Sequence, residues 1–295
     1  MITEKPVART APSENSSRPT ARSAWSGPFS GQVAVVTGSE SGIGRATAIA
    51  LGRQGACVVL NGRRQERLSE TERELAQEGI PVISCLADVT EFAQCNRLIQ
   101  TAIDTWGRID VLVANASISM RAYFEELHPD VFRQVLDSNV YGAVYPLKSA
   151  LPHLIRSRGC VTFISSISAL NGMPSGSAYC AGKAALVNLA HTLRLELAHT
   201  GIQVGVVHIG FTKNDPDKRV LNAQGEPVPI AWRPPSLQKT QEEVASAIVR
   251  HIRQRRKTTI LSGLGRLNSF VNRLSPALAD WILLKTYDRL RNLYE

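Results

Sequence analysis

The 295-residue sequence is poor in cysteine, in aromatic residues and in long apolar runs. Its five cysteines contain no Cys-x-x-Cys pair, and an odd number in a chain of this length does not indicate a disulfide framework. Aromatic residues make up 6% of the chain and do not interleave with a basic run, which argues against nucleic-acid binding. No apolar run approaches the roughly 18 residues that a membrane-spanning helix needs. We therefore expect a reduced, cytoplasmic protein with no integral membrane segment, no nucleic-acid partner and no metal site.

Acidic residues are also in deficit, and the formal charge is +9. The excess is confined to the ends of the chain: residues 1–30 carry a net +2 and residues 250–295 a net +7. Residues 31–249 hold twenty basic and twenty acidic residues, so the body is neutral. A basic face on the body that would bind nucleic acid is therefore not expected.

What the sequence does contain, from residue 31 onward, is an alternation of short β-branched runs with longer amphipathic stretches, which is typical of βαβ units. The runs are continuously apolar, as in strands that are covered on both faces. The expected strands are Val33–Thr37, Ala56–Leu60, Pro81–Leu86, Asp110–Ala114, Cys160–Ser165, Gln203–Ile209 and Thr258–Leu261. The sequence thus predicts an α/β fold over residues 31–262, a three-layer, doubly wound parallel sheet of the Rossmann type.

Local signals bound the remaining parts of the chain. A helix is expected over Gln65–Glu78, another from a cap at Thr90 to about Trp106, and a capping box opens a helix at Thr240. Residues 1–30, rich in Ser, Thr and Pro, predict a disordered leader. Periodicity stops over residues 212–239, and a connection of that length is usually functional or disordered. Pro276 divides residues 263–295 into two basic amphipathic helices that extend the fold.

Three glycines, Gly38, Gly42 and Gly44, follow the first expected strand and open a helix, the arrangement of a pyrophosphate-binding turn. At the end of the second strand, where NAD-binding proteins usually carry an acid, the chain has Asn61 and Gly62 followed by Arg63 and Arg64. A guanidinium suits a 2′-phosphate in both charge and geometry. The sequence therefore favours NADP over NAD.

The catalytic candidate is Tyr179-x-x-x-Lys183, because residues four apart lie on one face of a helix and an ammonium stabilises a nearby phenolate. Such a pair is common on surface helices and carries little weight by itself. Together with the glycine turn, Asn115-Ala116 and Ser166, however, it resembles the short-chain dehydrogenase/reductase family over residues 31 to about 250.

This resemblance implies a set of roles. Tyr179 would be the acid/base, Lys183 would hold the nicotinamide ribose and lower the tyrosine pKa, Ser166 would orient the substrate oxygen, and Asn139 would anchor a relay water. Residues 212–239 would form the substrate lid, and Asp88-Val89 would contact the adenine. The cofactor-binding residues would be Thr37, Gly38, Ser41, Gly42, Ile43, Gly44, Arg63, Arg64, Asp88, Val89, Asn115, Ala116, Tyr179, Lys183, Gly210 and Thr212.

We therefore expect an NADP(H)-dependent oxidoreductase that interconverts a lipophilic ketone and a secondary alcohol. The alternative is a non-catalytic NADP-binding regulatory or scaffolding protein of the same fold. The family resemblance suggests a homodimer or homotetramer. Two interpretations of residues 263–295 stay open: a peripheral anchor on a membrane surface, or an apolar stripe that packs on the body or on a sister subunit.

Overall fold

The computed structural model describes residues 26–294, with the side chains of residues 264, 268, 273 and 286–294 outside that description. The predicted leader therefore lies largely outside the described residues. The prediction of disorder is wrong for residues 26–30, which form a turn. Phe29 is buried in this turn, and the Phe29 N–H donates to the carbonyl oxygen of Gln54. The folded body thus begins before residue 31.

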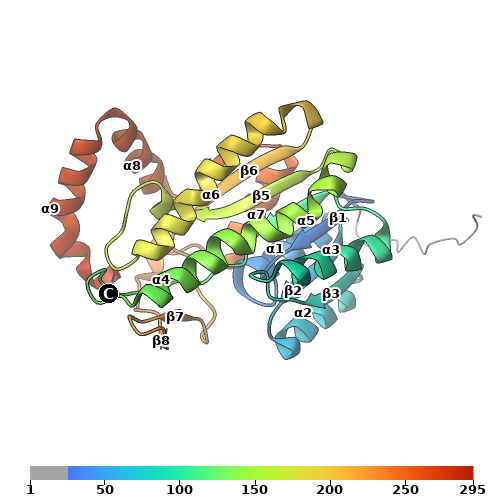
Figure 1. Ribbon diagram of the computed structural model, residues 1–295, viewed down its shortest axis with the longest axis horizontal. Coiled ribbons are helices and arrows are strands. Elements are labelled where there is room, and N and C mark those ends of the chain that lie inside the picture. The colour runs from blue at the N-terminus through green and yellow to red at the C-terminus, as the bar shows by residue number, and fades with distance from the viewer. Residues whose placement is uncertain (1–25, 295) are drawn as a thin grey trace, which may run out of the picture.

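A parallel sheet of seven strands in the order β3-β2-β1-β4-β5-β6-β9 forms the middle layer (Figure 1). Its strands are β1 (Val33–Val36), β2 (Cys57–Gly62), β3 (Val82–Leu86), β4 (Val111–Ala114), β5 (Cys160–Ser166), β6 (Gln203–Ile209) and β9 (Thr258–Ile260). Each expected strand is present, with its ends within two residues of the prediction. The predicted Rossmann-type fold is confirmed.

Two buried apolar clusters, one on each face of the sheet, make the three layers. On one face pack α1 (Gly42–Gly52), α2 (Gln65–Gln77) and α7 (Gln241–Arg253). On the other pack α3 (Phe92–Trp106), α5 (Gly142–Ser157) and α6 (Ser177–Glu196). The capping box at Thr240 is present, with its side chain bound to the N–H of Glu243 and the return bond formed. Because both faces are covered, the strands are apolar throughout rather than alternating.

The third helix begins later than the sequence predicted. Glu91, not Thr90, precedes its first residue, and the Thr90 N–H and hydroxyl both bind Asp88 Oδ1, at 2.9 and 2.8 Å. This is a short polar turn that competes with helix formation. Asp88, which follows β3, therefore stabilises the turn that precedes α3.

Asn139 lies in a π-helical turn, η1 (Asp137–Tyr141), which joins α4 (Pro129–Leu136) to α5 without a break. Helix α5 contains Pro146 and continues through it, as it does through Pro152. A proline at 146 cannot donate to the carbonyl of Gly142, so this helix tolerates the loss of a backbone bond just after a turn that is already widened.

Residues 212–239 are more ordered than their sequence suggests. They contain the antiparallel hairpin β7 (Arg219–Leu221) and β8 (Pro227–Pro229) and the single turn η4 (Pro235–Leu237). Two short 3-10 turns, η2 (Ile167–Ala169) and η3 (Ala198–Thr200), occur elsewhere. The hairpin is joined to the body by a bridge between Met120 and Leu221.

The C-terminal segment forms α8 (Gly263–Leu274) and α9 (Pro276–Tyr294), drawn in red beside the layered body in Figure 1. Large apolar side chains are exposed along these helices, namely Leu267, Phe270, Leu274, Leu278, Trp281, Ile282 and Leu284. Within the part of the chain that the structure describes, no helix is long and apolar enough to cross a membrane.

Candidate active site

A cleft of about 540 Å³ lies where β1, β2, β4, β5 and β6 end. In a parallel sheet the carboxyl ends of all strands meet at one edge, and the connections that follow them line a common crevice. Arg63 and Arg64 follow β2, and Tyr179 and Lys183 lie on α6 beside β5, so β1 and β4 separate the two pairs along the cleft. The topology thus gathers residues that are far apart in the sequence.

The glycine turn fits a bound dinucleotide. Gly38 and Gly42 have positive φ angles of 61° and 58°. A Cβ at Gly44 would stand 2.2 Å from the Gly38 carbonyl oxygen, so only glycine allows this turn to close against the start of α1. Gly42 faces the cleft, and the nearest atom to a Cβ built at this position, Asp215 Oδ2, would be 3.9 Å away. Ser41, Ile43, Gly210 and Thr212 also line the cleft.

An acidic side chain from the lid segment already binds this turn. The Gly42 N–H donates to Asp215 Oδ2 at 3.0 Å, and Asp215 Oδ1 accepts from Gln241 Nε2 at 2.8 Å. An N–H at a helix N-terminus is a ready donor to an anion. In this structure the carboxylate of Asp215 therefore lies where a pyrophosphate oxygen would bind.

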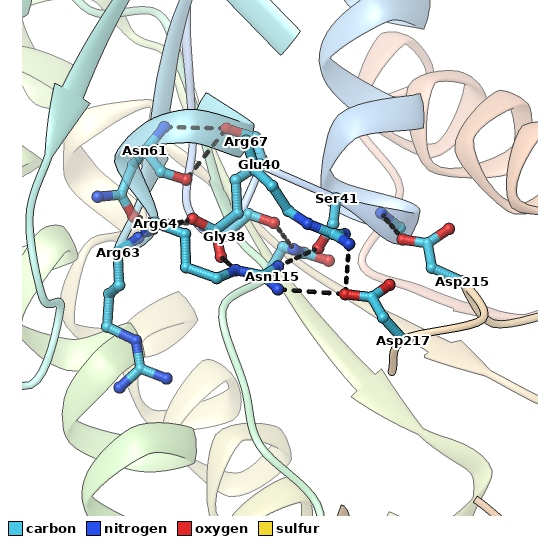
Figure 2. A network of polar contacts seen from close by, with 12 residues as sticks. Gly38, Glu40, Ser41, Asn61, Arg63, Arg64, Arg67, Asn115, Asp215 and Asp217 are labelled. Atoms are coloured by element: carbon cyan, nitrogen blue, oxygen red, sulfur yellow. Dashed lines mark hydrogen bonds and ion pairs between the residues drawn. The ribbon is translucent and has the colours of Figure 1, made fainter. Parts of the chain in front are cut away.

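A second acid, Glu40, organises the end of β2. Glu40 Oε2 accepts from the backbone N–H groups of Arg63 and Arg64 at 2.9 and 2.7 Å, and Oε1 accepts from Arg64 Nε at 2.8 Å. A Cβ at Gly62 would stand 2.3 Å from Glu40 Oε2, so a side chain at this position would displace the Glu40 carboxylate. Figure 2 shows Arg64 between Glu40 and Asp217.

Arg63 is placed differently from Arg64. Its side chain is 60% exposed and its one ion pair among the described residues is with Asp88, at 3.3 Å. Figure 2 shows it pointing away from Glu40 and Asp217. Both predicted phosphate ligands are exposed, but Arg64 is paired with two carboxylates and Arg63 with one.

Asn115 and Thr37 support the turn from within the sheet. The Asn115 side chain donates to the carbonyl oxygens of Thr37 and Gly38 at 2.9 and 3.2 Å, and the N–H groups of Asn115 and Ala116 donate to the Thr37 hydroxyl. Asn61 accepts from the Gly38 N–H at 3.3 Å. These side chains position the glycine turn. Asp88 and buried Val89 line the cleft beyond them.

Tyr179 and Ser166 meet at the far end of the cleft. Ser166 ends β5, Tyr179 lies in the first turn of α6, and their hydroxyl groups are hydrogen-bonded. Burial raises the pKa of Tyr179, while the Ser166 hydrogen bond and the nearby Arg121 oppose the rise. The Ser166 hydroxyl also accepts from the Ser168 N–H at 3.2 Å, so it caps the following turn as well.

Lys183 lies one helical turn after Tyr179. Its Nζ donates to the Ile164 carbonyl oxygen at 2.9 Å and lies 5.6 Å from the centre of the tyrosine ring. Burial lowers the pKa of Lys183 to about 7. The predicted pair thus shares one helix face, although the cations that lower the tyrosine pKa in this structure are Arg121 and Arg233.

Asn139 is fully buried beside α6. Its Oδ1 accepts from the Ile118 N–H at 2.9 Å, and its Nδ2 has no partner among the described residues. A buried amide donor usually has a hydrogen-bond acceptor. The position therefore suits an ordered water molecule, which is the role that the sequence resemblance suggested.

Sequence reasoning missed four side chains that shape the cleft: Glu40, Asp215, Arg121 and Arg233. No motif marks them, and the contacts of Glu40, Asp215 and Arg233 are with residues that are distant in the chain. Met173 lines the cleft, whereas Tyr123 and the 76% exposed Trp232 do not. No group of His, Cys, Asp and Glu that could hold a metal occurs among the described residues.

Comparison with known proteins agrees with this geometry. The family model for short chain dehydrogenases matches residues 32–225. The chain is 38% identical over 200 residues to 11-beta-hydroxysteroid dehydrogenase A of Arachis hypogaea, covering 66% of this chain and 57% of that protein. It is 31% identical over 254 residues to dehydrogenase/reductase SDR family member 7B of Xenopus laevis, covering 83% and 79%. The match thus spans little more than half of the Arachis protein.

Solved structures share the fold. A short chain dehydrogenase/reductase from Burkholderia phymatum in complex with NAD has a TM-score of 0.75 at 22% identity, covering 85% of this chain and 96% of that one. An alcohol dehydrogenase from Thermococcus sibiricus complexed with 5-hydroxy-NADP has a TM-score of 0.68 at 25% identity, covering 78% and 95%. Because the family model covers well over half of the chain, this protein belongs to the short chain dehydrogenase family.

Proposed function

We propose that this protein is an NADP(H)-dependent oxidoreductase that interconverts a lipophilic ketone and the corresponding secondary alcohol. The observation that carries the proposal is the hydrogen bond between the Ser166 and Tyr179 hydroxyl groups, at one end of a cleft whose other end is a glycine turn. The two ends of this cleft suit the two halves of a dinucleotide, with the reacting carbonyl beside Tyr179.

The side chains suit proton transfer to a carbonyl oxygen. When bound, the reduced nicotinamide supplies the hydride that adds to the carbonyl carbon. Tyr179 donates its hydroxyl proton to the oxygen that becomes the alcohol, and the Ser166 hydroxyl donates a hydrogen bond to the same oxygen. Lys183, from the same face of α6, holds the nicotinamide ribose. The unpartnered Nδ2 of Asn139 holds a water that returns a proton toward Lys183 and Tyr179.

The choice of NADP rests on the end of β2. Arg63 offers a solvent-facing guanidinium beside the expected position of the adenosine ribose, and Arg64 and Arg67 lie next to it in the cleft. A 2′-phosphate would bind a guanidinium through charge-assisted hydrogen bonds. One of the structural relatives above holds an NADP derivative and another holds NAD, so the fold serves both.

An apolar substrate body suits this cleft, whose lining includes Ile118, Ile167, Met173, Val220 and Ile230. The names of several relatives refer to hydroxysteroids, which are apolar alcohols. These observations support a lipophilic ketone or secondary alcohol as the substrate class.

We further propose a cytoplasmic protein that forms homodimers or homotetramers. The exposed apolar side chains of α8 and α9 either contact a sister subunit or lie on a membrane surface. Sedimentation with anionic liposomes, comparing the full chain with a form that ends at Gly263, separates the two. Liposome binding that is lost on truncation supports the membrane, whereas a smaller oligomer with unchanged partitioning supports the subunit contact.

The catalytic proposal is tested by NADPH oxidation in single-turnover experiments with a panel of ketones. Tyr179→Phe removes only the acidic hydroxyl and should abolish turnover while NADPH still binds. Wild-type rates in this variant would refute the proposed role. Binding of NADPH by the wild-type protein without turnover of any ketone or alcohol would instead favour a regulatory or scaffolding protein.

A further inference from the structure

Two arginines stand beside Tyr179 at the substrate end of the cleft. Arg121 follows the bridge between Met120 and the lid hairpin, and its Nη1 donates to the Met120 carbonyl oxygen at 2.8 Å. Arg233 comes from the lid segment, with its guanidinium carbon 4.5 Å from the centre of the Phe211 ring. Both line the cleft, one from the body and one from the lid.

Neither guanidinium forms an ion pair among the residues that the structure describes. Arg233 Nε is buried and has no hydrogen-bond partner there. Burial lowers the pKa of both groups, and the proximity of Arg121 contributes to the fall at Arg233, whose pKa is about 10. Two half-buried cations that repel each other are unfavourable unless an anion joins them.

The four acids of the cleft all bind groups other than Arg121 and Arg233. Glu40 and Asp217 bind Arg64, Asp88 binds Arg63, and Asp215 binds the Gly42 N–H, as Figure 2 shows in part. The cleft is lined by nine basic residues and only these four acidic ones. Among the described residues, no acidic side chain of the cleft therefore neutralises the charges of Arg121 and Arg233 beside Tyr179.

We propose that the substrate carries an oxoanion, such as a carboxylate, that Arg121 and Arg233 bind together while its apolar part contacts Met173, Val220 and Ile230. The inference rests on the proposed function and narrows its substrate to an amphiphilic keto acid or hydroxy acid. Paired guanidinium groups suit an oxoanion, since each offers several donors in one plane. Because one arginine belongs to the lid, an anion would also hold the lid against the body.

The cofactor phosphates do not account for these two groups. The pyrophosphate is expected at Gly42 and the 2′-phosphate at Arg63, both at the opposite end of the cleft. Arg121 and Arg233 instead are close enough to Tyr179 to oppose the rise in its pKa. Their position is that of groups that face the reacting molecule.

The test compares apolar keto acids of increasing chain length with their methyl esters, which have the same shape without the charge. For the acids that fit, kcat/KM of the wild-type protein should exceed that of the ester by about tenfold or more, which corresponds to about 1.4 kcal/mol, near the lower limit for a hydrogen bond to a charged group. Arg121→Met and Arg233→Met should each lower the ratio of kcat/KM for the acid to kcat/KM for the ester toward one. Arg121→Lys and Arg233→Lys, which keep the charge, should retain part of the preference for the acid.

Lys239→Met is the matched control. Lys239 is a basic residue of the same lid that is exposed and lies outside the cleft. Its replacement should leave the preference for acids unchanged. Sulfonate and phosphonate analogues of the preferred acid show which oxoanion the pair accepts.

Each outcome separates the two proposals. Equal turnover of acids and esters overturns the anionic substrate while the oxidoreductase function stands. Calorimetric binding of a keto acid that depends on Arg233, without any turnover, supports the anion site and overturns the proposed function. Loss of NADPH affinity in Arg233→Met with an unchanged preference assigns this arginine to the cofactor and also overturns the inference.

Discussion

Asp215 competes with the cofactor for the glycine turn, and its removal should therefore tighten NADPH binding. Its Oδ2 accepts the Gly42 N–H at 3.0 Å, and a bound pyrophosphate requires that same donor. The lid carboxylate must leave before the phosphate can bind. The free energy of this displacement is subtracted from the affinity for the cofactor.

The size of the effect follows from the hydrogen bond. A hydrogen bond to a charged group contributes about 1.5–3 kcal/mol. Asp215 is only half-buried, so water weakens the contact and the lower figure applies. Since about 1.4 kcal/mol corresponds to a factor of ten, Asp215→Ala should lower the Kd for NADPH about tenfold. Asp215→Asn, which keeps an acceptor without the charge, should lower it by less.

Titration of NADPH fluorescence measures the Kd directly. Glu242→Gln is the control, because Glu242 is an exposed acid next to Gln241 that lies outside the cleft. Its Kd should stay at the wild-type value. An unchanged or weaker affinity in Asp215→Ala would show that this carboxylate does not compete with the phosphate.

Further predictions concern the cofactor, the chemistry and the stability. Arg63→Ala should weaken NADPH binding about tenfold and leave NADH nearly unaffected, because only NADPH carries the 2′-phosphate; an equal loss for both would exclude this role. Ser166→Ala should lower kcat by about a hundredfold with little change in the Kd of NADPH, as stopped-flow kinetics can measure. Gly44→Ala should prevent NADPH binding, because its Cβ would stand 2.2 Å from the Gly38 carbonyl oxygen; a titration that gives the wild-type Kd contradicts this. Burial, reinforced by Arg256, lowers the pKa of His251 to about 4 from 6.5. The unfolded chain therefore binds the extra proton first, and stability should fall by about 3 kcal/mol as the pH drops from 6.5 to 4. Urea denaturation across that range should show a smaller fall in His251→Asn.

The sequence predicted the fold well because the sheet is buried on both faces. Each strand is a continuous apolar run, and the residues that follow β1, β2 and β5 carry the motifs. The hairpin β7–β8 could not be found in the same way, since Pro227 and Pro229 interrupt any strand pattern. The prediction that Thr90 caps the third helix was wrong, because Asp88 binds Thr90 in a turn before the helix begins.

The candidate site was predictable only where a motif is local. Tyr179 and Lys183 share one helix, and the glycine turn is a single stretch of chain. By contrast, Asp215 reaches Gly42 across 173 positions of sequence, and Arg233 approaches Tyr179 only after the lid folds over the sheet edge. Contacts between distant loops depend on topology, which residue spacing does not contain.

The π-helical turn at Asp137–Tyr141 sets how the helix that begins at Pro129 is rotated relative to Asn139 and to the helix that follows. Each residue of an α-helix turns the chain by about 100° and advances it by about 1.5 Å. Deleting one residue from this turn would convert it to α-helix and rotate every side chain on one side of the deletion relative to those on the other. Either Asn139 would leave Ile118, or the apolar face of α5 would leave the sheet. This stretch should therefore accept changes of side chain far more readily than any change of length.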